Sequence, residues 1–258
     1  MNTQAHANGR EPVLELRALS KSFGGLRAVR DVTLKIMPGD RKAIIGPNGA
    51  GKTTLFNLMT GRFPVSAGTI ELDGRSIDGL APHEINRRGL SRSFQITSIF
   101  PRMTVFENIR CGLLWSQGYR YSFWHLVARQ HTLTAAAEQL LEDVNLISRR
   151  HVPAGLLTYA EQRALEIAIT IAGGAHTIIL DEPTAGMSRT EADRAVELIR
   201  RMTEGKTLVM VEHDMSVVFD LADVISVLVY GRIIASGPPA AIRGNRAVQE
   251  AYLGTVAS

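Results

Sequence analysis

Short apolar segments that alternate with polar residues predict a strand-rich first part of the chain. Residues 32–36 alternate between apolar and polar side chains and lead to Pro38-Gly39, as expected for a half-buried strand that ends in a turn. Residues 43–45 form a short apolar strand before a glycine-rich loop, and residues 69–72 run into the hairpin-turn pair Asp73-Gly74. The first 80 residues therefore predict antiparallel strands combined with one strand–loop–helix unit.

The pattern from residue 82 to about 168 is helical, with few strand signals. Thr104 and Glu107 have the spacing of a capping box that opens a helix, and residues 134–144 are rich in alanine and leucine. An aromatic cluster between them is interpreted as packing within this helical part. Its members are Trp115, Tyr119, Tyr121, Phe123 and Trp124.

Short apolar strands alternate with helices from residue 176 onward. The strands are expected at 177–180, 207–211 and 224–229, and such alternation predicts a parallel sheet with helical crossovers. The fold class is therefore α/β, with the helical part inserted into an α/β core.

Composition leads us to expect a chain that stays inside the cell and does not cross a membrane by itself. The 258 residues are 45% hydrophobic, yet no stretch approaches the roughly 20 apolar residues of a spanning helix. The polar start of the chain, residues 1–12, lacks the apolar core of a secretory signal. The single cysteine, Cys111, excludes an internal disulfide framework and fits a reducing compartment.

The net charge of +4 raises the question of nucleic acid as a partner. The arginines are scattered in twos and threes, and no run of five or six like charges occurs. We therefore interpret them as solvated faces and expect no nucleic-acid partner.

A phosphate-binding loop is the strongest local prediction. Residues 46–54 satisfy the pattern G-x-x-x-x-G-K-[ST], with an apolar strand before them and a helix from Lys52 to about residue 60 after them. Converging backbone N–H groups and the helix N-terminus would hold polyphosphate, Lys52 would reach the terminal phosphates, and the Thr53 hydroxyl would bind Mg²⁺. The predicted nucleotide-binding residues of the loop are Gly46, Pro47, Asn48, Gly49, Ala50, Gly51, Lys52, Thr53 and Thr54.

Two acidic residues follow a buried strand in the second half. Asp181 would hold Mg²⁺ through its water shell, and Glu182 could polarise the attacking water as a general base. Pro183 stops the strand at this point. His213 follows the strand 207–211 at the same edge of the sheet, which favours a contact with the γ-phosphate.

Two further residues are weaker candidates when taken alone. The amide oxygen of Gln95 is suited to Mg²⁺ and to the attacking water. Phe23 precedes Gly24-Gly25 and could stack on a base, although spacing alone favours a place in the core.

These elements, in this order, resemble the ATPase subunits of ABC transporters, from about Val13 to Gly254. The resemblance implies a P-loop NTPase core with an antiparallel β subdomain and an inserted helical subdomain. It implies one domain over residues 10–256, in which 10–95 and 165–256 form the core and 96–164 the helical subdomain. ATP and Mg²⁺ would be the bound species.

The resemblance also assigns roles to the motifs. Phe23 is placed as the adenine-stacking aromatic, Gln95 as the Q-loop glutamine and His213 as the switch histidine. In such proteins two subunits face head to tail, and each ATP lies between one phosphate loop and the signature of the other subunit. The signature position, usually LSGGQ, is occupied here by Leu157, Thr158, Tyr159, Ala160 and Glu161.

Finer motifs resemble the larger ATPase subunit of branched-chain amino acid importers. The implied partners are a second ATPase subunit (a different chain or a second copy), transmembrane permease subunits and, indirectly, a periplasmic or extracellular solute-binding protein. The chain would then lie at the cytoplasmic face of the inner membrane. Urea and lipopolysaccharide systems have related ATPases. The motifs are residues 21–25, 94–95, 100–108, 211–215 and 251–254, with the long helical stretch 113–137.

Two alternatives remain at this point. A soluble ABC ATPase of DNA repair or translation would carry a coiled-coil insertion or two tandem cassettes, and the sequence has neither. A nucleotide-regulated subunit that hydrolyses little is disfavoured by Glu182 and His213. Two departures from the family pattern concern contacts across the dimer: Ala160 replaces a signature glycine, and Ser188 stands where Asp or Asn is usual.

Overall fold

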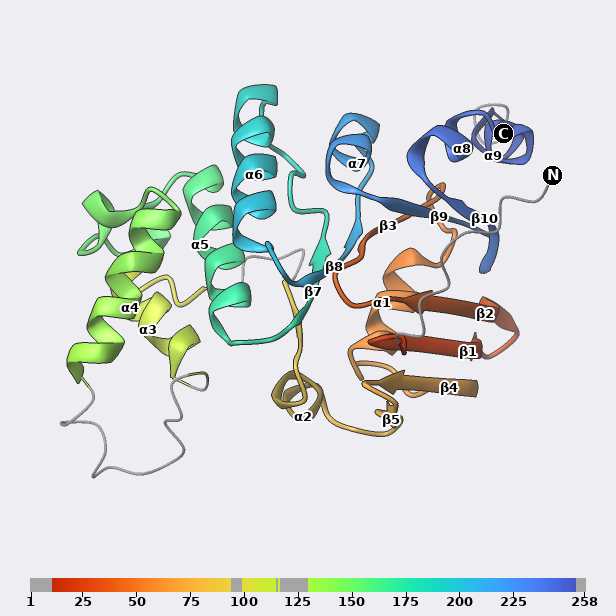
Figure 1. Cartoon of the computed structure of the whole chain (residues 1–258), viewed down its shortest axis with the longest axis horizontal. Coiled ribbons are helices and arrows are strands. Elements are labelled where there is room, and N and C mark those ends of the chain that lie inside the picture. The colour runs from red at the N-terminus through yellow and green to blue at the C-terminus, as the bar shows by residue number, and fades with distance from the viewer. Residues whose placement is uncertain (1–10, 94–98, 115, 117–129, 254–258) are drawn as a thin grey trace. The chain divides into compact units, whose positions relative to one another are not determined.

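The computed structural model describes residues 11–93, 99–114, 116 and 130–253. The described residues fall into two compact units, one within Met1–Ile85 and Asp223–Ser258 and the other within Asn86–Ala222 (Figure 1). Gln95 and the aromatic cluster at 115–124 lie outside the described residues. The expected division into 10–95, 96–164 and 165–256 follows secondary structure and family motifs, and it stays a prediction.

The first unit contains the expected antiparallel sheet. The alternation at 32–36 is confirmed, because Val32, Leu34 and Ile36 are all buried. The hairpin at Asp73-Gly74 is also confirmed, with φ of 50° and 68°, the left-handed pair that a tight hairpin turn requires. The strands, in the order β2-β1-β4-β5, are β1 (Leu14–Phe23), β2 (Leu26–Ile36), β4 (Ala67–Leu72) and β5 (Arg75–Ser76).

A second set of strands in this unit carries the phosphate loop. β3 (Arg41–Ile45) pairs in parallel with β9 (Val224–Val229), which pairs antiparallel with β10 (Arg232–Gly237). The buried side chains of Leu55 and Phe56 on α1 (Lys52–Met59) belong to the core of the protein. The short helices α8 (Pro239–Arg243) and α9 (Arg246–Leu253) follow β10.

The second unit contains the expected parallel strands. β7 (Thr177–Asp181) and β8 (Thr207–Val211) are buried at every residue, and β6 (Leu90–Arg92) pairs with β7 on its other side. β6 falls in the region that the sequence pattern predicts to be helical, because three residues are too few to show a period of two. α6 (Arg189–Met202) and α7 (Met215–Leu221) complete the alternation.

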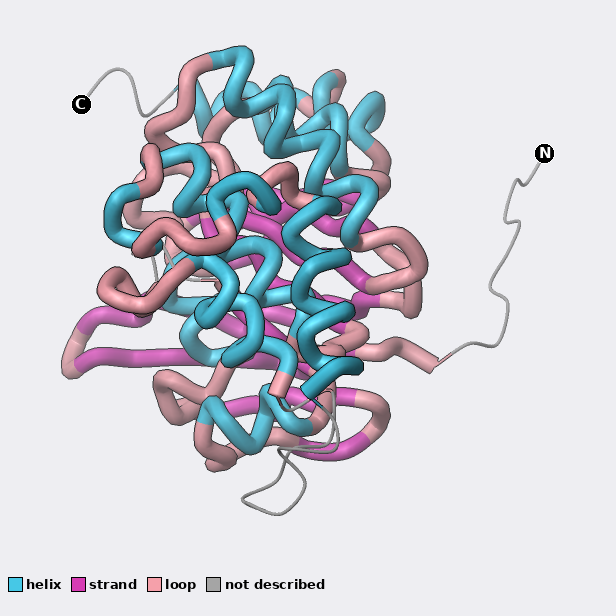
Figure 2. Tube along the Cα trace, turned by 90° about the vertical axis from the view of Figure 1, so that its left-hand side faces the viewer, coloured by secondary structure: helices cyan, strands magenta, loops and turns pink. Residues whose placement is uncertain are grey.

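Helices make up most of the described residues from 99 to 172 (cyan in Figure 2). The capping box at Thr104 and Glu107 is confirmed, and the helix expected at 134–144 extends from Gln130 to Asp143. Buried apolar residues of four helices pack into one cluster, among them Ile109, Leu141, Leu165 and, from α6, Leu198. The helices are α2 (Pro82–Arg87), where the chain enters this unit, α3 (Val105–Leu113), α4 (Gln130–Asp143) and α5 (Tyr159–Ala172), with 3-10 turns at Ile147–Arg149 and Ala154–Leu156.

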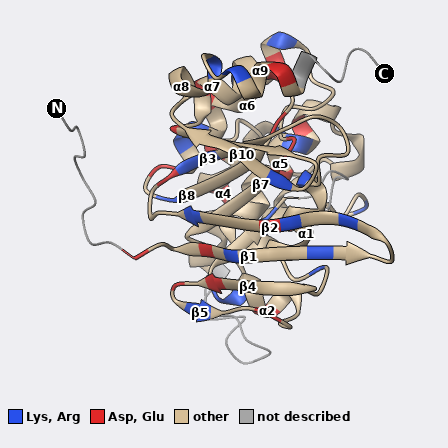
Figure 3. Ribbon diagram, turned by 90° about the vertical axis from the view of Figure 1, so that its right-hand side faces the viewer, with Lys and Arg blue, Asp and Glu red and all other residues tan. Residues whose placement is uncertain are grey.

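Charged residues are dispersed among the described residues, and several of them lie within ion-pair distance of an opposite charge. Lys, Arg, Asp and Glu are interspersed along β1 and β2, and the one charged residue of β4 is Glu71 (Figure 3). Arg17 lies 2.8 Å from Glu15 and 3.2 Å from Glu71, and in the second unit Arg200 lies 2.8 Å from Asp220. Across the described ranges, no helix is both long enough and apolar enough to cross a bilayer.

Candidate functional site

The phosphate loop connects β3 to α1 in a conformation that its glycines make possible. Gly51 has φ of 103° and caps the N-terminus of α1. A Cβ at Gly46 would collide with the carbonyl oxygen of Leu228, and one at Gly51 would collide with that of Ala28. These two glycines are therefore required by close packing of backbone on backbone.

The turn between β9 and β10 braces the same loop, a feature that the sequence pattern does not reveal. The Gly231 N–H donates to the carbonyl oxygen of Ala50 at 2.8 Å, and the Gly231 carbonyl accepts from the Arg30 N–H at 2.8 Å. The phosphate loop is thus tied to β2 and to the β9–β10 turn, segments far from it in sequence.

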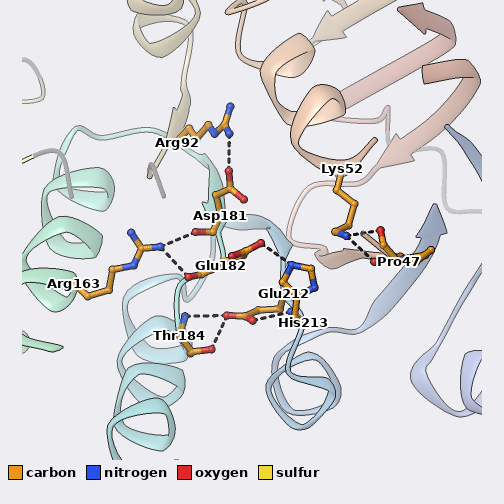
Figure 4. A network of polar contacts seen from close by, with 10 residues as sticks. Pro47, Lys52, Arg92, Arg163, Asp181, Glu182, Thr184, Glu212 and His213 are labelled. Atoms are coloured by element: carbon orange, nitrogen blue, oxygen red, sulfur yellow. Dashed lines mark hydrogen bonds and ion pairs between the residues drawn. The ribbon is translucent and has the colours of Figure 1, made fainter. Parts of the chain in front are cut away.

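Lys52 extends over the loop that precedes it. Its side chain is buried, and Nζ donates to the carbonyl oxygens of Gly46 at 2.6 Å and Pro47 at 3.1 Å (Figure 4). Thr53 is exposed and Thr54 half-buried on the first turn of α1. The ammonium group is therefore held above the N-terminus of α1, where anions bind most favourably.

Phe23 ends β1 with 43% of its surface exposed. The interpretation of Phe23 as a core residue, made from spacing alone, is therefore wrong. Its ring meets Phe63 edge to face at a centroid distance of 5.4 Å, and Lys21 Nζ lies 5.0 Å from its centroid. Lys21 is itself held by a 2.7 Å bond to the Pro64 carbonyl. The ring is supported from two sides while part of it stays open to solvent.

Asp181 lies buried at the end of β7. Its Oδ2 forms a 2.6 Å ion pair with Nη2 of Arg92, the last residue of β6, and both side chains are at most 5% exposed. Its Oδ1 is buried and accepts no hydrogen bond from any residue that the structure describes. A buried carboxylate is thus neutralised through one oxygen, while the other keeps its capacity as an acceptor.

Glu182 and His213 lie in direct contact. Glu182 Oε1 is 2.7 Å from His213 Nε2, and the His213 ring is 48% exposed (Figure 4). Glu182 has φ of 48°, unusual for a residue other than glycine, and its N–H donates to the Val211 carbonyl at 2.9 Å. A strained backbone held by neighbouring strands is typical of functional positions. A carboxylate and an imidazole at this distance can share or pass a proton.

Glu212 is a site residue that the sequence pattern did not single out. It is buried, and its Oε1 accepts from the N–H and hydroxyl of Thr184 at 2.9 and 2.6 Å. Its Oε2 accepts from the His213 N–H at 3.0 Å. Glu212 therefore joins the segment after Glu182 to the segment of His213. These residues line a pocket of about 350 Å³.

The signature segment begins α5 as expected. The Thr158 side chain accepts from the Glu161 N–H, and the Glu161 carboxylate accepts from the Thr158 N–H at 2.9 Å, which confirms the capping box. The hydrogen bond from the Thr158 backbone is the main reason that the pKa of Glu161 is lowered. Ala160 lies in the first turn of α5 and is not among the residues with positive φ. Alanine is therefore compatible with the backbone at this position.

Ser188 caps α6 in the same way. Its hydroxyl accepts from the Glu191 N–H, and the Glu191 carboxylate accepts from the Ser188 N–H at 2.8 Å. Because Ser, Asp and Asn cap helices about equally well, the departure from the family's usual Asp or Asn preserves the local structure.

Comparison with known proteins places these motifs in a family. The model of the family described as ABC transporter matches residues 29–185, and that described as Branched-chain amino acid ATP-binding cassette transporter matches residues 232–258. The chain is 38% identical to the high-affinity branched-chain amino acid transport ATP-binding protein BraF of Pseudomonas aeruginosa, over 94% of this chain and 98% of the relative. It is 37% identical to the corresponding protein LivG of Escherichia coli K12, over 95% and 98% of the two chains.

A solved structure agrees with this result. The nucleotide-free ATP-binding cassette of an ABC transporter superposes with a TM-score of 0.80 at 26% identity, over 93% of this chain and 98% of the other. Fold, motifs and relatives therefore point to one conclusion. The chain belongs to the ABC transporter family, as an ATP-hydrolysing subunit of the branched-chain amino acid type.

Proposed function

We propose that this chain binds ATP with Mg²⁺ on residues 46–54 and hydrolyses it with Glu182 and His213 to energise an importer of branched-chain amino acids. The observation that carries the proposal is the 2.7 Å contact between Glu182 and His213. In the chain, Glu182 directly follows the buried Asp181. A general base needs a partner that orients it, and His213 is in place to do so. The similarity to BraF and LivG supplies the transported class.

The donor set fits Mg²⁺. Oδ1 of Asp181 is buried and has no partner among the described residues, so it can accept from a water of a hydrated ion. The Thr53 hydroxyl and the Gln95 amide are further oxygen donors, although Gln95 lies outside the described residues. Mg²⁺ would neutralise charge on the β- and γ-phosphates during phosphoryl transfer.

The remaining roles follow from chemistry and family. Lys52 would exchange the carbonyls of Gly46 and Pro47 for phosphate oxygens, and Phe23 would stack on adenine with its open face. Glu182 would take the proton of the attacking water, and His213 would hold Glu182 in position. Residues 157–161 would meet the ATP held by the phosphate loop of a second ATPase subunit.

The chain would act at the membrane without spanning it. Permease subunits would hold it at the cytoplasmic face of the inner membrane, and a solute-binding protein on the other side would deliver the amino acid. BraF and LivG are transport proteins, so a soluble ABC ATPase of DNA repair or translation is not supported.

Two variants test the proposal. Lys52→Ala should lose most ATP binding, because it removes the cation above the phosphate loop. Glu182→Gln should keep ATP binding and lose turnover by about a hundredfold or more, because the amide cannot accept the proton. Binding is measured by nucleotide titration and turnover by phosphate release with the partner ATPase present. Equal turnover for Glu182→Gln and the parent would contradict the assignment.

A further inference from the structure

Arg163 lies on α5, the helix that begins with the signature, and binds the backbone at the start of residues 181–186, here called the catalytic segment. Its Nη2 donates to the carbonyl oxygens of Asp181 at 2.6 Å and Glu182 at 2.9 Å (Figure 4). Its Nε donates to the carbonyl oxygen of Pro183 at 3.4 Å. Arg163 is 2% exposed, and Nη1 forms a 2.6 Å ion pair with the buried Glu166 one turn further along α5. One guanidinium therefore joins three consecutive carbonyls to the helix that begins with the signature.

A second contact joins the same two segments. The ring of Tyr159, the first residue of α5, lies against Gly186, so that a Cβ on Gly186 would be 3.4 Å from Tyr159 Cε1. Arg163 and Tyr159 therefore contact both ends of the segment from Asp181 to Gly186.

The chemistry of Arg163 makes this connection stiff. A buried guanidinium is tolerated only when its N–H groups are hydrogen-bonded and its charge is paired, and the planar group fixes the direction of each bond. If α5 shifts, the three carbonyls shift with it or a buried cation loses its acceptors. The carboxylate of Glu182 acts from the middle of this backbone, and hydrolysis is sensitive to displacements of about 1 Å.

We propose that Arg163 is a positioning residue that transmits the state of the signature segment, residues 157–161, to Glu182 of the same chain. This inference rests on the proposed function, in which the signature meets the ATP of the second subunit and Glu182 acts on this chain's own ATP. Engagement of the signature at one ATP moves α5, and Arg163 carries that movement to the base at the other ATP. The two hydrolysis sites are thereby coupled within one chain.

A double-mutant cycle tests the coupling. In the dimer with the partner ATPase, the partner's catalytic glutamate is replaced by glutamine so that only Glu182 hydrolyses ATP. Thr158→Ala, which disturbs the signature, should then lower turnover at Glu182 by about tenfold. In the Arg163→Lys background the same change should cost less than about twofold. If the losses of turnover caused by Thr158→Ala and Arg163→Lys simply multiply in the double variant, the two residues act independently and the proposal is wrong. The proposal is also wrong if Thr158→Ala does not lower turnover at all.

Arg163→Lys by itself should lower kcat by about tenfold and leave KM for ATP unchanged, because lysine keeps the charge and loses the planar fork. Arg150→Lys is the matched control, since Arg150 forms a 2.6 Å ion pair with Glu138 in the same unit and does not bond to the catalytic segment. Equal losses of kcat in the two variants would contradict a positioning role. A parent dimer without ATPase activity would instead contradict the proposed function.

A second measurement does not depend on the folding of an Arg163 variant. Hydrogen exchange of the backbone amides of residues 184–187 should be faster in Thr158→Ala than in the parent chain, without nucleotide. Unchanged exchange in this segment, with faster exchange at the start of α5, would show that the signature is not coupled to it.

Discussion

At the scale of single residues, the buried ion pair between Arg92 and Asp181 is a contact whose disruption should be costly. Both charges are buried, and the pair closes at 2.6 Å. Arg92→Met should lower the free energy of unfolding by about 3–5 kcal/mol, because it leaves a buried carboxylate without its cation. Urea denaturation measures the loss. Arg200→Met is the control, because its pair with Asp220 is largely exposed and contributes about 0–1 kcal/mol. Similar losses in the two variants would contradict this account.

Phe23 gives a residue-scale prediction for nucleotide binding. The ring is supported by Phe63 and Lys21 and keeps 43% of its surface exposed. Stacking of a base on an aromatic ring contributes ~1–3 kcal/mol, so Phe23→Ala should weaken ATP binding by about tenfold or more. Direct titration measures this affinity, with Phe63→Leu as a comparison that keeps Phe23 itself. An unchanged affinity in Phe23→Ala would remove the ring from the site.

Contacts between single residues are also the feature that was hardest to predict from the sequence. Arg163 binds carbonyls 18 to 20 positions away, and Arg92 binds a carboxylate 89 positions away. No local pattern contains such distances. A partial signal for Arg163 did exist, because Arg163 and Glu166 stand three residues apart at the start of a helix whose later residues are mostly apolar. Buried charges in such a stretch must be paired, and they can be recognised on that ground.

At the scale of elements, helix starts were predictable because their signals are local. The Ser or Thr and the Glu of a capping box stand three residues apart, and the boxes at Thr104 and Thr158 were predicted and are confirmed. β6 was missed because it is too short to show alternation, and its place beside β7 depends on pairing across many residues. The bracing of the phosphate loop by Gly231 was missed for the same reason.

The capping box of α5 predicts a pH dependence of stability. The pKa of Glu161 is lowered, first by the Thr158 backbone hydrogen bond, so its ionised form stabilises the folded state. This contribution is present above the usual glutamate pKa of about 4.3 and is lost as pH falls through the lowered value. Glu161→Gln should therefore lower Tm at pH 7, by an amount that shrinks as pH falls below about 4.3.

Thermal unfolding monitored by circular dichroism across this range provides the measurement. Glu204→Gln serves as control, because Glu204 is exposed and lies outside the capping boxes. A Tm difference for Glu161→Gln that stays constant with pH would show that its charge does not act through the cap.

At the scale of the whole molecule, the candidate residues divide between the two compact units, each taken by itself. The phosphate loop belongs to one unit, and Asp181, Glu182 and His213 belong to the other. Sequence motifs could predict both of these sets of residues, because the residues of each set follow buried strands. They could not decide whether Ala160 in the signature makes the two ATP sites of a dimer unequal, since that depends on backbone conformation.

The helical conformation of Ala160 leads to the last prediction. If this position needed a positive φ, alanine would be strained and glycine would improve hydrolysis at the partner's phosphate loop. Ala160 instead lies in the first turn of α5, where alanine is favoured over glycine by up to about 1 kcal/mol. Ala160→Gly should therefore lower Tm slightly and bring no gain in turnover. The measurement is phosphate release by a dimer in which Glu182→Gln silences this chain's own site. A severalfold rise in turnover would show instead that the Ala160 methyl obstructs the partner's phosphate and that the two sites are unequal.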